Sequence, residues 1–157
     1  MSFFLKDINL KGKTALVTGA TKGLGRGTAQ AIAEAGGNVI AIGRNQSELN
    51  SLGKIIKKLK VKYLSFNCDV NDFNSIKRFI SRLKSLDILV NNAGTNIPEP
   101  FEQIKQSSMN YLVDLNLKAA FNVAQLVVKK MLKNKKRGGS IINMSSQLGH
   151  VGMAGRN

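Results

Sequence analysis

The sequence predicts an α/β protein whose core is a doubly wound parallel sheet, and two observations lead to this fold class. Short apolar segments alternate with longer ones in which apolar residues recur at helical spacing. The longer segments are apolar on one face only, which is typical of helices that cover a sheet. Such alternation favours parallel strands that are buried on both faces and joined by crossover helices, as in Rossmann-like domains.

The first half of the chain supplies three strands and two helices. Residues 13–18 (KTALVT) form a short apolar run, and residues 25–35 carry small and apolar side chains at helical spacing up to a pair of glycines. A second apolar run at 38–42 precedes a helix over 47–59, with leucines and isoleucines on one face and lysines on the other. The third strand is predicted at 62–66.

The second half repeats the alternation. Asp72 can cap a helix that runs to about residue 84, and the fourth strand follows at 87–90. Two prolines mark a loop at 98–100 before one long helix over 107–133. The fifth strand is predicted at 140–144. We therefore expect a sheet of five parallel strands, covered on both sides.

Length and composition fit one globular domain. The chain has 157 residues, of which 43% are hydrophobic, and this excludes a disordered tail, a collagen-like repeat and a disulfide scaffold. We expect a single domain over residues 1–157. Because a doubly wound sheet usually has a sixth strand, we also expect this domain to be incomplete at its C-terminus, with the last strands and helices missing.

Charge and cysteine content bear on partners and location. The formal net charge of +15 includes lysine clusters on a predicted helix face and at a helix C-terminus, where cations are ordinary. Few aromatic residues interleave them and no nucleic-acid-binding motif is present, so nucleic acid is not an expected partner. No apolar run is long enough to span a membrane. Cys68 is the only cysteine, which fits a reducing compartment, and we expect a cytoplasmic protein.

A glycine-rich loop, TGATKGLG, connects the first predicted strand to the first predicted helix, with glycines at 19, 23 and 25. Glycine permits a tight turn and leaves no Cβ atom in the way of a pyrophosphate, and the N-terminus of the following helix suits an anion. A glycine cluster alone can also be an ordinary tight turn. Its position after the first strand of a β-α series favours dinucleotide binding.

Together with three further segments, this loop resembles the classical short-chain dehydrogenase/reductase family. NNAG at 91–94 follows the fourth strand, Asn116 lies in DLNL within the long helix, and Ser145-Ser146 ends the fifth strand in IINMSS. The resemblance covers essentially the whole chain. It implies hydride transfer between a nicotinamide cofactor and a carbonyl or alcohol carbon of a small molecule, by a protein that is often a homo-oligomer.

The resemblance also implies roles for individual residues. Asn116 would hold a water of the proton relay, Ser146 would polarise the substrate oxygen, and Asp69 would accept from the adenine amino group, with Val70 beside the ring. From the residues alone, Asp69 can also be a helix cap, Asn116 a buried asparagine bonded to backbone, and Ser146 a polar turn residue. The predicted cofactor-binding residues are Gly19, Thr21, Lys22, Gly23, Leu24, Gly25, Arg44, Asp69, Val70, Asn92, Ala93 and Gly94.

The predicted cofactor preference depends on the end of the second strand. A carboxylate there favours NAD, whereas a cation accommodates the 2′-phosphate of NADP. Gly43 occupies the acidic position, Arg44 follows it, and Lys22 lies in the glycine loop. Arginine can grip a phosphate with two parallel hydrogen bonds and lysine can add a point charge, so we expect NADP(H) in preference to NAD(H).

The resemblance implies a catalytic tyrosine, followed four residues later by lysine, that would fall just beyond Asn157. Tyr63 and Tyr111 have no lysine at that spacing. We therefore expect the 157 residues alone to bind dinucleotide weakly and to be inactive or nearly so, and a non-catalytic NADP(H)-binding module is the alternative. The segment SQLGHVG resembles that of 3-oxoacyl and sugar-acid reductases. His150 within it is expected to be a loop residue, because one histidine cannot form a metal site.

Overall fold

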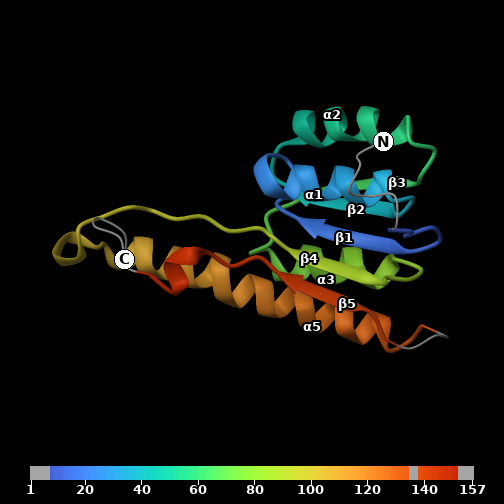
Figure 1. The fold of residues 1–157 in the computed structure, drawn as a ribbon. Coiled ribbons are helices and arrows are strands. Elements are labelled where there is room, and N and C mark those ends of the chain that lie inside the picture. Colours follow the sequence, from blue (N-terminus) through green and yellow to red (C-terminus); the bar gives the residue numbers. More distant parts are fainter. Residues whose placement is uncertain (1–7, 135–137, 152–157) are drawn as a thin grey trace.

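Five strands form one parallel sheet in the computed structural model of the chain, which describes residues 8–134 and 138–151 (Figure 1). The strands are β1 (Thr14–Thr18), β2 (Asn38–Gly43), β3 (Tyr63–Asn67), β4 (Ile88–Asn91) and β5 (Ser140–Asn143). Their order across the sheet is β3-β2-β1-β4-β5, and every neighbouring pair is parallel. The predicted fold class is confirmed.

Helices cover both faces of the sheet. Figure 1 shows α1 (Gly23–Glu34) and α2 (Gln46–Lys57) on one face, with α3 (Phe73–Arg82) and α5 (Ala120–Met131) on the other. Because successive side chains of a strand point to opposite faces, Val17 packs with α1 and α2 while Leu16 packs with α3 and α5. Burial of these two apolar layers holds the sheet and its helices together.

Helix boundaries and faces differ in detail from the sequence prediction. The first helix begins at Gly23 rather than at residue 25, with Lys22 as its N-cap. Ile55 and Leu59, which belong to the predicted apolar face of the second helix, are 38% and 39% exposed, whereas Ile56 is buried and α2 ends at Lys57.

The prediction of one regular helix over 107–133 is wrong in its middle. α4 (Gln106–Val113) and α5 are joined by η3 (Asp114–Ala119), a stretch with the wider turns of a π-helix. Thr95 holds this stretch, because Asn116 donates to its carbonyl at 2.8 Å and accepts from its N–H at 3.0 Å. A π segment rotates the residues that follow it relative to a regular helix, and Phe121 is left 64% exposed.

The sheet is not covered along its whole width by the residues that the structure describes. β5 lies at the edge and all four of its residues are exposed, including Ile141 and Ile142. In Figure 1 the loop after β4 and α4 extend beyond the sheet as an arm. Two short turns of 3-10 helix, η2 (Phe101–Gln103) and η4 (Gln147–Gly149), complete the described elements.

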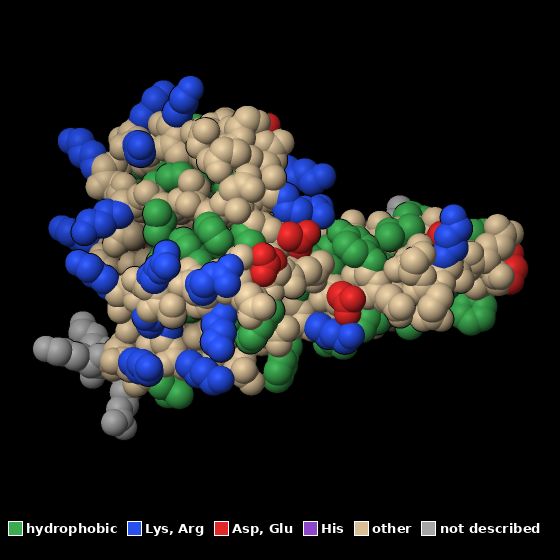
Figure 2. Space-filling model, turned by 180° about the vertical axis from the view of Figure 1, so that it is seen from behind, with side chains coloured by type: hydrophobic (Ala, Val, Ile, Leu, Met, Phe, Trp, Pro, Cys, Tyr) green, Lys and Arg blue, Asp and Glu red, His purple; other side chains and the backbone are tan. Residues whose placement is uncertain are grey.

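Charged and apolar side chains are distributed unevenly over the surface. Figure 2 shows lysines and arginines spread over the sheet body and apolar side chains along the arm. Among the described residues, no helix is both long and apolar enough to cross a membrane. Within the same residues no cluster of His, Cys, Asp or Glu could hold a metal ion, and His150 is exposed in a turn.

Candidate functional site

The site candidate lies where the strand order reverses. The chain passes from β1 to β2 on one side and later returns to place β4 on the other side of β1. In such sheets a crevice opens beyond the carboxyl ends of the strands at this switch point. A cleft of about 850 Å³ is found there, lined by the segments that follow β1, β2, β3 and β4. All predicted cofactor-binding residues except Gly25 line it.

The three glycines of the loop after β1 differ in what surrounds them. Gly23 has φ +54°, and a Cβ atom built on it would meet nothing within 4 Å. Gly19, at φ +64°, lies so close to the β4 segment that a Cβ would be 2.9 Å from the Cα of Ala93. Gly25 is buried, and a Cβ there would overlap the Asn92 amide. Gly19 and Gly25 thus make room for the NNAG segment, whereas Gly23 leaves free space, and the role of the three glycines toward a pyrophosphate stays a prediction.

The start of α1 is open to an anion. Lys22 is its N-cap in an extended conformation, no described side chain caps the helix, and its first turn contains no acidic residue. The first N–H groups of a helix have no partner within the helix and carry its positive dipole end. Since Lys22, Gly23 and Leu24 line the cleft, these donors lie at its wall.

The segment NNAG holds the glycine loop in place. Asn92 Nδ2 donates to the carbonyls of Thr18 at 3.0 Å and Gly19 at 3.2 Å, while Thr18 Oγ1 accepts from the N–H groups of Asn92 and Ala93. Asn91 donates to the Ala120 carbonyl on the other face, and its buried Oδ1 has no hydrogen-bond partner among the described residues. These bonds tie the ends of β1 and β4 together on one wall of the cleft.

Arg44 lines the cleft directly after β2 and contacts the segment that follows β3. Its Nη1 lies 3.5 Å from Asp69 Oδ2 and donates to the Tyr111 hydroxyl at 3.2 Å. The bond to Tyr111 raises the pKa of Arg44 above its ordinary value, and the side chain is a cation as arginine is in general. The cap of α3 is Asp72, and Asp69 instead accepts from the N–H of Asn71 at 2.9 Å. The alternative that Asp69 is a helix cap is therefore wrong.

The two predicted catalytic residues, Asn116 and Ser146, have different hydrogen-bond partners in the described part of the chain. Asn116 is exposed and bonded to Thr95, so the alternative of a buried asparagine is wrong, although its partner is backbone. Ser146 is also exposed, and its hydroxyl accepts from the N–H of Leu148 at 3.2 Å at the start of η4. No hydrogen bond between Asn116 and Ser146 occurs among the described residues, and their catalytic roles stay predictions.

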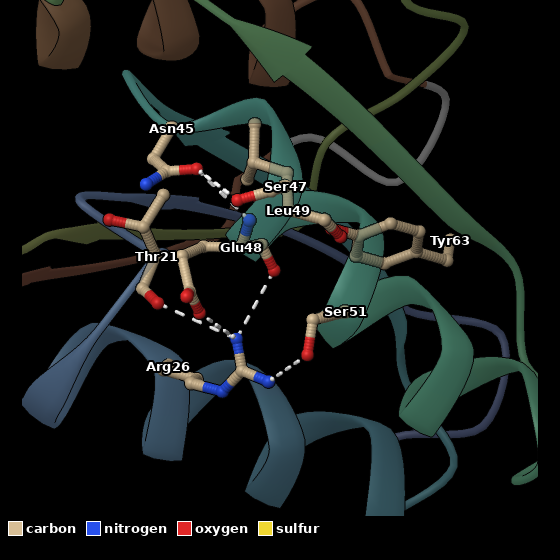
Figure 3. A network of polar contacts seen from close by, with 8 residues as sticks. All are labelled: Thr21, Arg26, Asn45, Ser47, Glu48, Leu49, Ser51 and Tyr63. Carbon is tan, nitrogen blue, oxygen red and sulfur yellow. Dashed lines mark hydrogen bonds and ion pairs between the residues drawn. The ribbon is translucent and has the colours of Figure 1, made fainter.

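The residues that line the cleft but are absent from the predicted cofactor-binding set include three that form hydrogen bonds with one another, Arg26, Asn45 and Glu48. Figure 3 shows them in one polar network between α1 and α2. The Asn45 side chain accepts from the N–H of Glu48 at 3.1 Å and so caps α2. An asparagine followed three residues later by glutamate is a capping pattern, and it could have located this helix start. Tyr111 was missed as a partner of Arg44 because it lies 67 residues away in the chain.

Sheet order and a cleft at the switch point define the chain as a Rossmann-like α/β protein. The family model described as "short chain dehydrogenase" matches residues 13–157. The chain therefore belongs to the short-chain dehydrogenase family.

Two curated relatives illustrate the similarity. Over 149 residues the chain is 38% identical to 3-oxoacyl-(acyl-carrier-protein) reductase FabG of Rickettsia conorii (strain ATCC VR-613 / Malish 7), covering 95% of this chain and 60% of the relative. It is 34% identical over 150 residues to L-xylulose reductase of Mesocricetus auratus, covering 94% of this chain and 59% of the relative. The chain thus spans about 60% of the length of these relatives.

Solved structures agree with the fold and differ in their cofactor. Carveol dehydrogenase from Mycobacterium avium, in complex with NAD, matches with a TM-score of 0.88 at 27% identity, over 94% of this chain and 59% of that chain. Actinorhodin polyketide ketoreductase with NADPH matches with a TM-score of 0.84 at 28% identity, over 92% of this chain and 57% of that chain. Similar folds therefore accompany either cofactor.

Proposed function

We propose that the chain is the cofactor-binding part of an NADP(H)-dependent oxidoreductase that transfers hydride between nicotinamide and a carbonyl or alcohol carbon. The observation that carries the cofactor preference is the end of β2, which offers a cation and no carboxylate. Gly43 is buried there, and a Cβ atom on it would overlap the methyl group of Thr21. Arg44 and Lys22 line the cleft beside it, and both are exposed.

The cleft suits a dinucleotide on grounds independent of that preference. The uncapped start of α1 presents N–H donors to a diphosphate, and Gly23 leaves the approach free of a Cβ atom. The Asp69 carboxylate can accept from an adenine amino group. The cofactor, when bound, supplies the hydride, while these residues bind and orient it.

For catalysis we propose that Ser146 polarises the substrate oxygen and that Asn116 takes part in proton transfer. The 157 residues contain no tyrosine followed four residues later by lysine, so we propose that they turn over poorly by themselves. A 3-oxoacyl compound or a sugar-type carbonyl is the proposed substrate class, supported by the names of the two relatives. We place the protein in the cytoplasm, and we propose a homo-oligomer because Leu117 and Phe121 expose apolar surface on η3 and α5.

A charge reversal at Arg44 tests the cofactor assignment. Arg44→Asp should weaken NADPH binding about tenfold or more and NADH binding less than about threefold, since only NADPH carries the added phosphate. Dissociation constants from nucleotide fluorescence titrations measure both. Lys62→Asp is the control. Lys62 is exposed and directly precedes β3, so it lies at the amino ends of the strands, whereas the cleft lies at their carboxyl ends. Equal losses for both nucleotides would overturn the NADP(H) assignment.

A further inference from the structure

We infer that Arg26 is a positioning residue for recognition of the 2′-phosphate. The inference rests on the proposed NADP(H) site and adds a residue to it. Arg26 ties the glycine loop to the first turn of α2 and neutralises Glu48, a carboxylate that lines the same cleft as Lys22 and Arg44. The two cations can then act on a phosphate without an unpaired negative charge beside them.

The contacts of Arg26 reach two other segments of the chain (Figure 3). From α1, its Nη1 donates to the Glu48 carbonyl at 3.1 Å and contacts the Glu48 carboxylate at 3.2 Å. The same nitrogen lies 3.5 Å from the carbonyl of Thr21 in the glycine loop. Its Nη2 donates to the Ser51 hydroxyl at 2.9 Å. The Arg26 side chain is only 20% exposed, so its guanidinium is held by the surrounding residues.

The segments that Arg26 joins are those that carry the proposed phosphate ligands. Thr21 and Lys22 are adjacent in the glycine loop, and the Thr21 methyl group packs over Gly43 at the end of β2. Arg44 follows Gly43, and the Asn45 cap then fixes the start of α2, with Glu48 in its first turn. A shift of α2 relative to the loop would therefore move Arg44 relative to Lys22.

Charge gives Arg26 a second effect. The Glu48 side chain is 48% exposed at the cleft wall, where its negative charge would oppose a bound phosphate. The guanidinium at 3.2 Å compensates that charge. Because the pair is partly exposed, solvent and salt screen it, and the effect on binding is moderate. Lysine would keep the charge but could not hold the loop carbonyl, the carboxylate and the serine in one planar fork.

The test compares two nucleotides in a set of variants of the 157-residue chain. Arg26→Met should weaken NADPH binding about tenfold and NADH binding less than about threefold, measured by fluorescence titration at low salt. Adding Glu48→Gln should restore part of the NADPH affinity, because it removes the uncompensated carboxylate but does not replace the contacts of Arg26 to Thr21 and Ser51. A purely structural role would not be rescued in this way. Arg26→Lys should fall between the wild type and Arg26→Met. Adenosine 2′,5′-bisphosphate against 5′-AMP repeats the comparison with probes that contain no nicotinamide.

The outcomes separate this inference from the function on which it rests. A wild-type chain without preference for NADPH overturns both. A wild-type preference that Arg44→Asp abolishes, together with equal losses of NADPH and NADH in Arg26→Met, overturns the role of Arg26 alone. Failure of Glu48→Gln to restore any NADPH affinity overturns the charge compensation between Arg26 and Glu48. If circular dichroism shows that Arg26→Met is unfolded, Arg26→Lys decides, since a loss confined to NADPH supports the inference and an equal loss for both nucleotides overturns it.

Discussion

Helices α1 and α3 begin in opposite ways, although each follows a strand of the same sheet. α3 is capped by Asp72, whose carboxylate accepts from the N–H of Ser75 at 3.0 Å. α1 follows Lys22, whose side chain has no acceptor, and no described side chain caps the helix. Leaving helix-start donors unpaired costs stability, and capping residues ordinarily prevent that cost.

The difference supports the proposal of an anion at the start of α1 only together with its place at the cleft, because α4 also begins after a lysine, Lys105, without a side-chain cap. At α3 the chain satisfies the first N–H groups with its own side chain. At α1 it leaves them at the wall of the cleft, beside a glycine with free space around it. Departures from the local rules of helix stability tend to mark functional sites. The contrast is therefore an argument for anion binding at α1 that does not depend on any similarity to known proteins.

The largest expected effect comes from adding a methyl group at Gly25. Gly25→Ala would place a Cβ atom against the Asn92 amide and the Gly19 carbonyl, so α1 must move away from the end of β4. We expect the free energy of unfolding in urea to fall by about 2–3 kcal/mol, as in overpacked cores.

The matched control for Gly25→Ala lies two residues further along α1. Gly27 is exposed, and a Cβ atom on it would meet nothing within 4 Å. Gly27→Ala should stabilise the helix by about 0.5–1 kcal/mol, because alanine loses less backbone entropy than glycine. Equal stability changes at the two positions would show that α1 does not pack closely on the NNAG segment.

Local patterns in the sequence were sufficient for most of the fold. β1, β2 and β4 are nearly continuous apolar runs, which is what strands buried on both faces require. The exposure of β5 does not follow from its own residues, because Ile141 and Ile142 are apolar and exposure depends on which other elements cover the strand. The π-helix could not be predicted either, since its partner Thr95 lies 21 residues before Asn116.

In the candidate site, too, features set by neighbouring residues could be predicted, and features set by residues distant in the chain could not. The glycine loop is a contiguous motif, and the sequence was enough to find it. The close packing of Gly25 was not predictable, because it involves the Asn92 amide, which follows β4 and is distant from the loop in the chain. Tyr111 and Arg26 were missed for a similar reason: tyrosine on a helix and arginine near a helix start are common, and only the fold brings them to Arg44 and Glu48.

A smaller effect is expected from making the start of α1 resemble that of α2, which carries Glu48 in its first turn. Leu24 is 72% exposed in the first turn of α1. Leu24→Glu should change the unfolding free energy by no more than about 0.5 kcal/mol, in the stabilising direction, because an acid favours the positive end of the helix dipole.

The same substitution should weaken binding of both nucleotides, since both carry the pyrophosphate. Affinity for NADPH and NADH should fall together by about tenfold in fluorescence titrations. Leu24→Gln removes the apolar side chain without adding charge. It therefore separates the effect of the negative charge from the effect of losing the leucine. Unchanged affinity in Leu24→Glu would mean that the start of α1 is not the phosphate site.

The smallest expected effect is at the capped helix and depends on pH. Hydrogen bonds from Ser75 lower the pKa of Asp72 below its ordinary value of 3.8. A carboxylate whose pKa is lowered by folding stabilises the native state above the unfolded pKa and loses that contribution as pH falls through the folded pKa.

Asp72→Asn keeps a capping oxygen but cannot ionise. Its Tm should lie below that of the wild type by a few degrees at most at pH 7, and the difference should disappear toward pH 2. A difference that persisted unchanged at pH 2 would show that the charge of Asp72 is not what stabilises this helix start, and the contrast with α1 would then be one of hydrogen bonding alone.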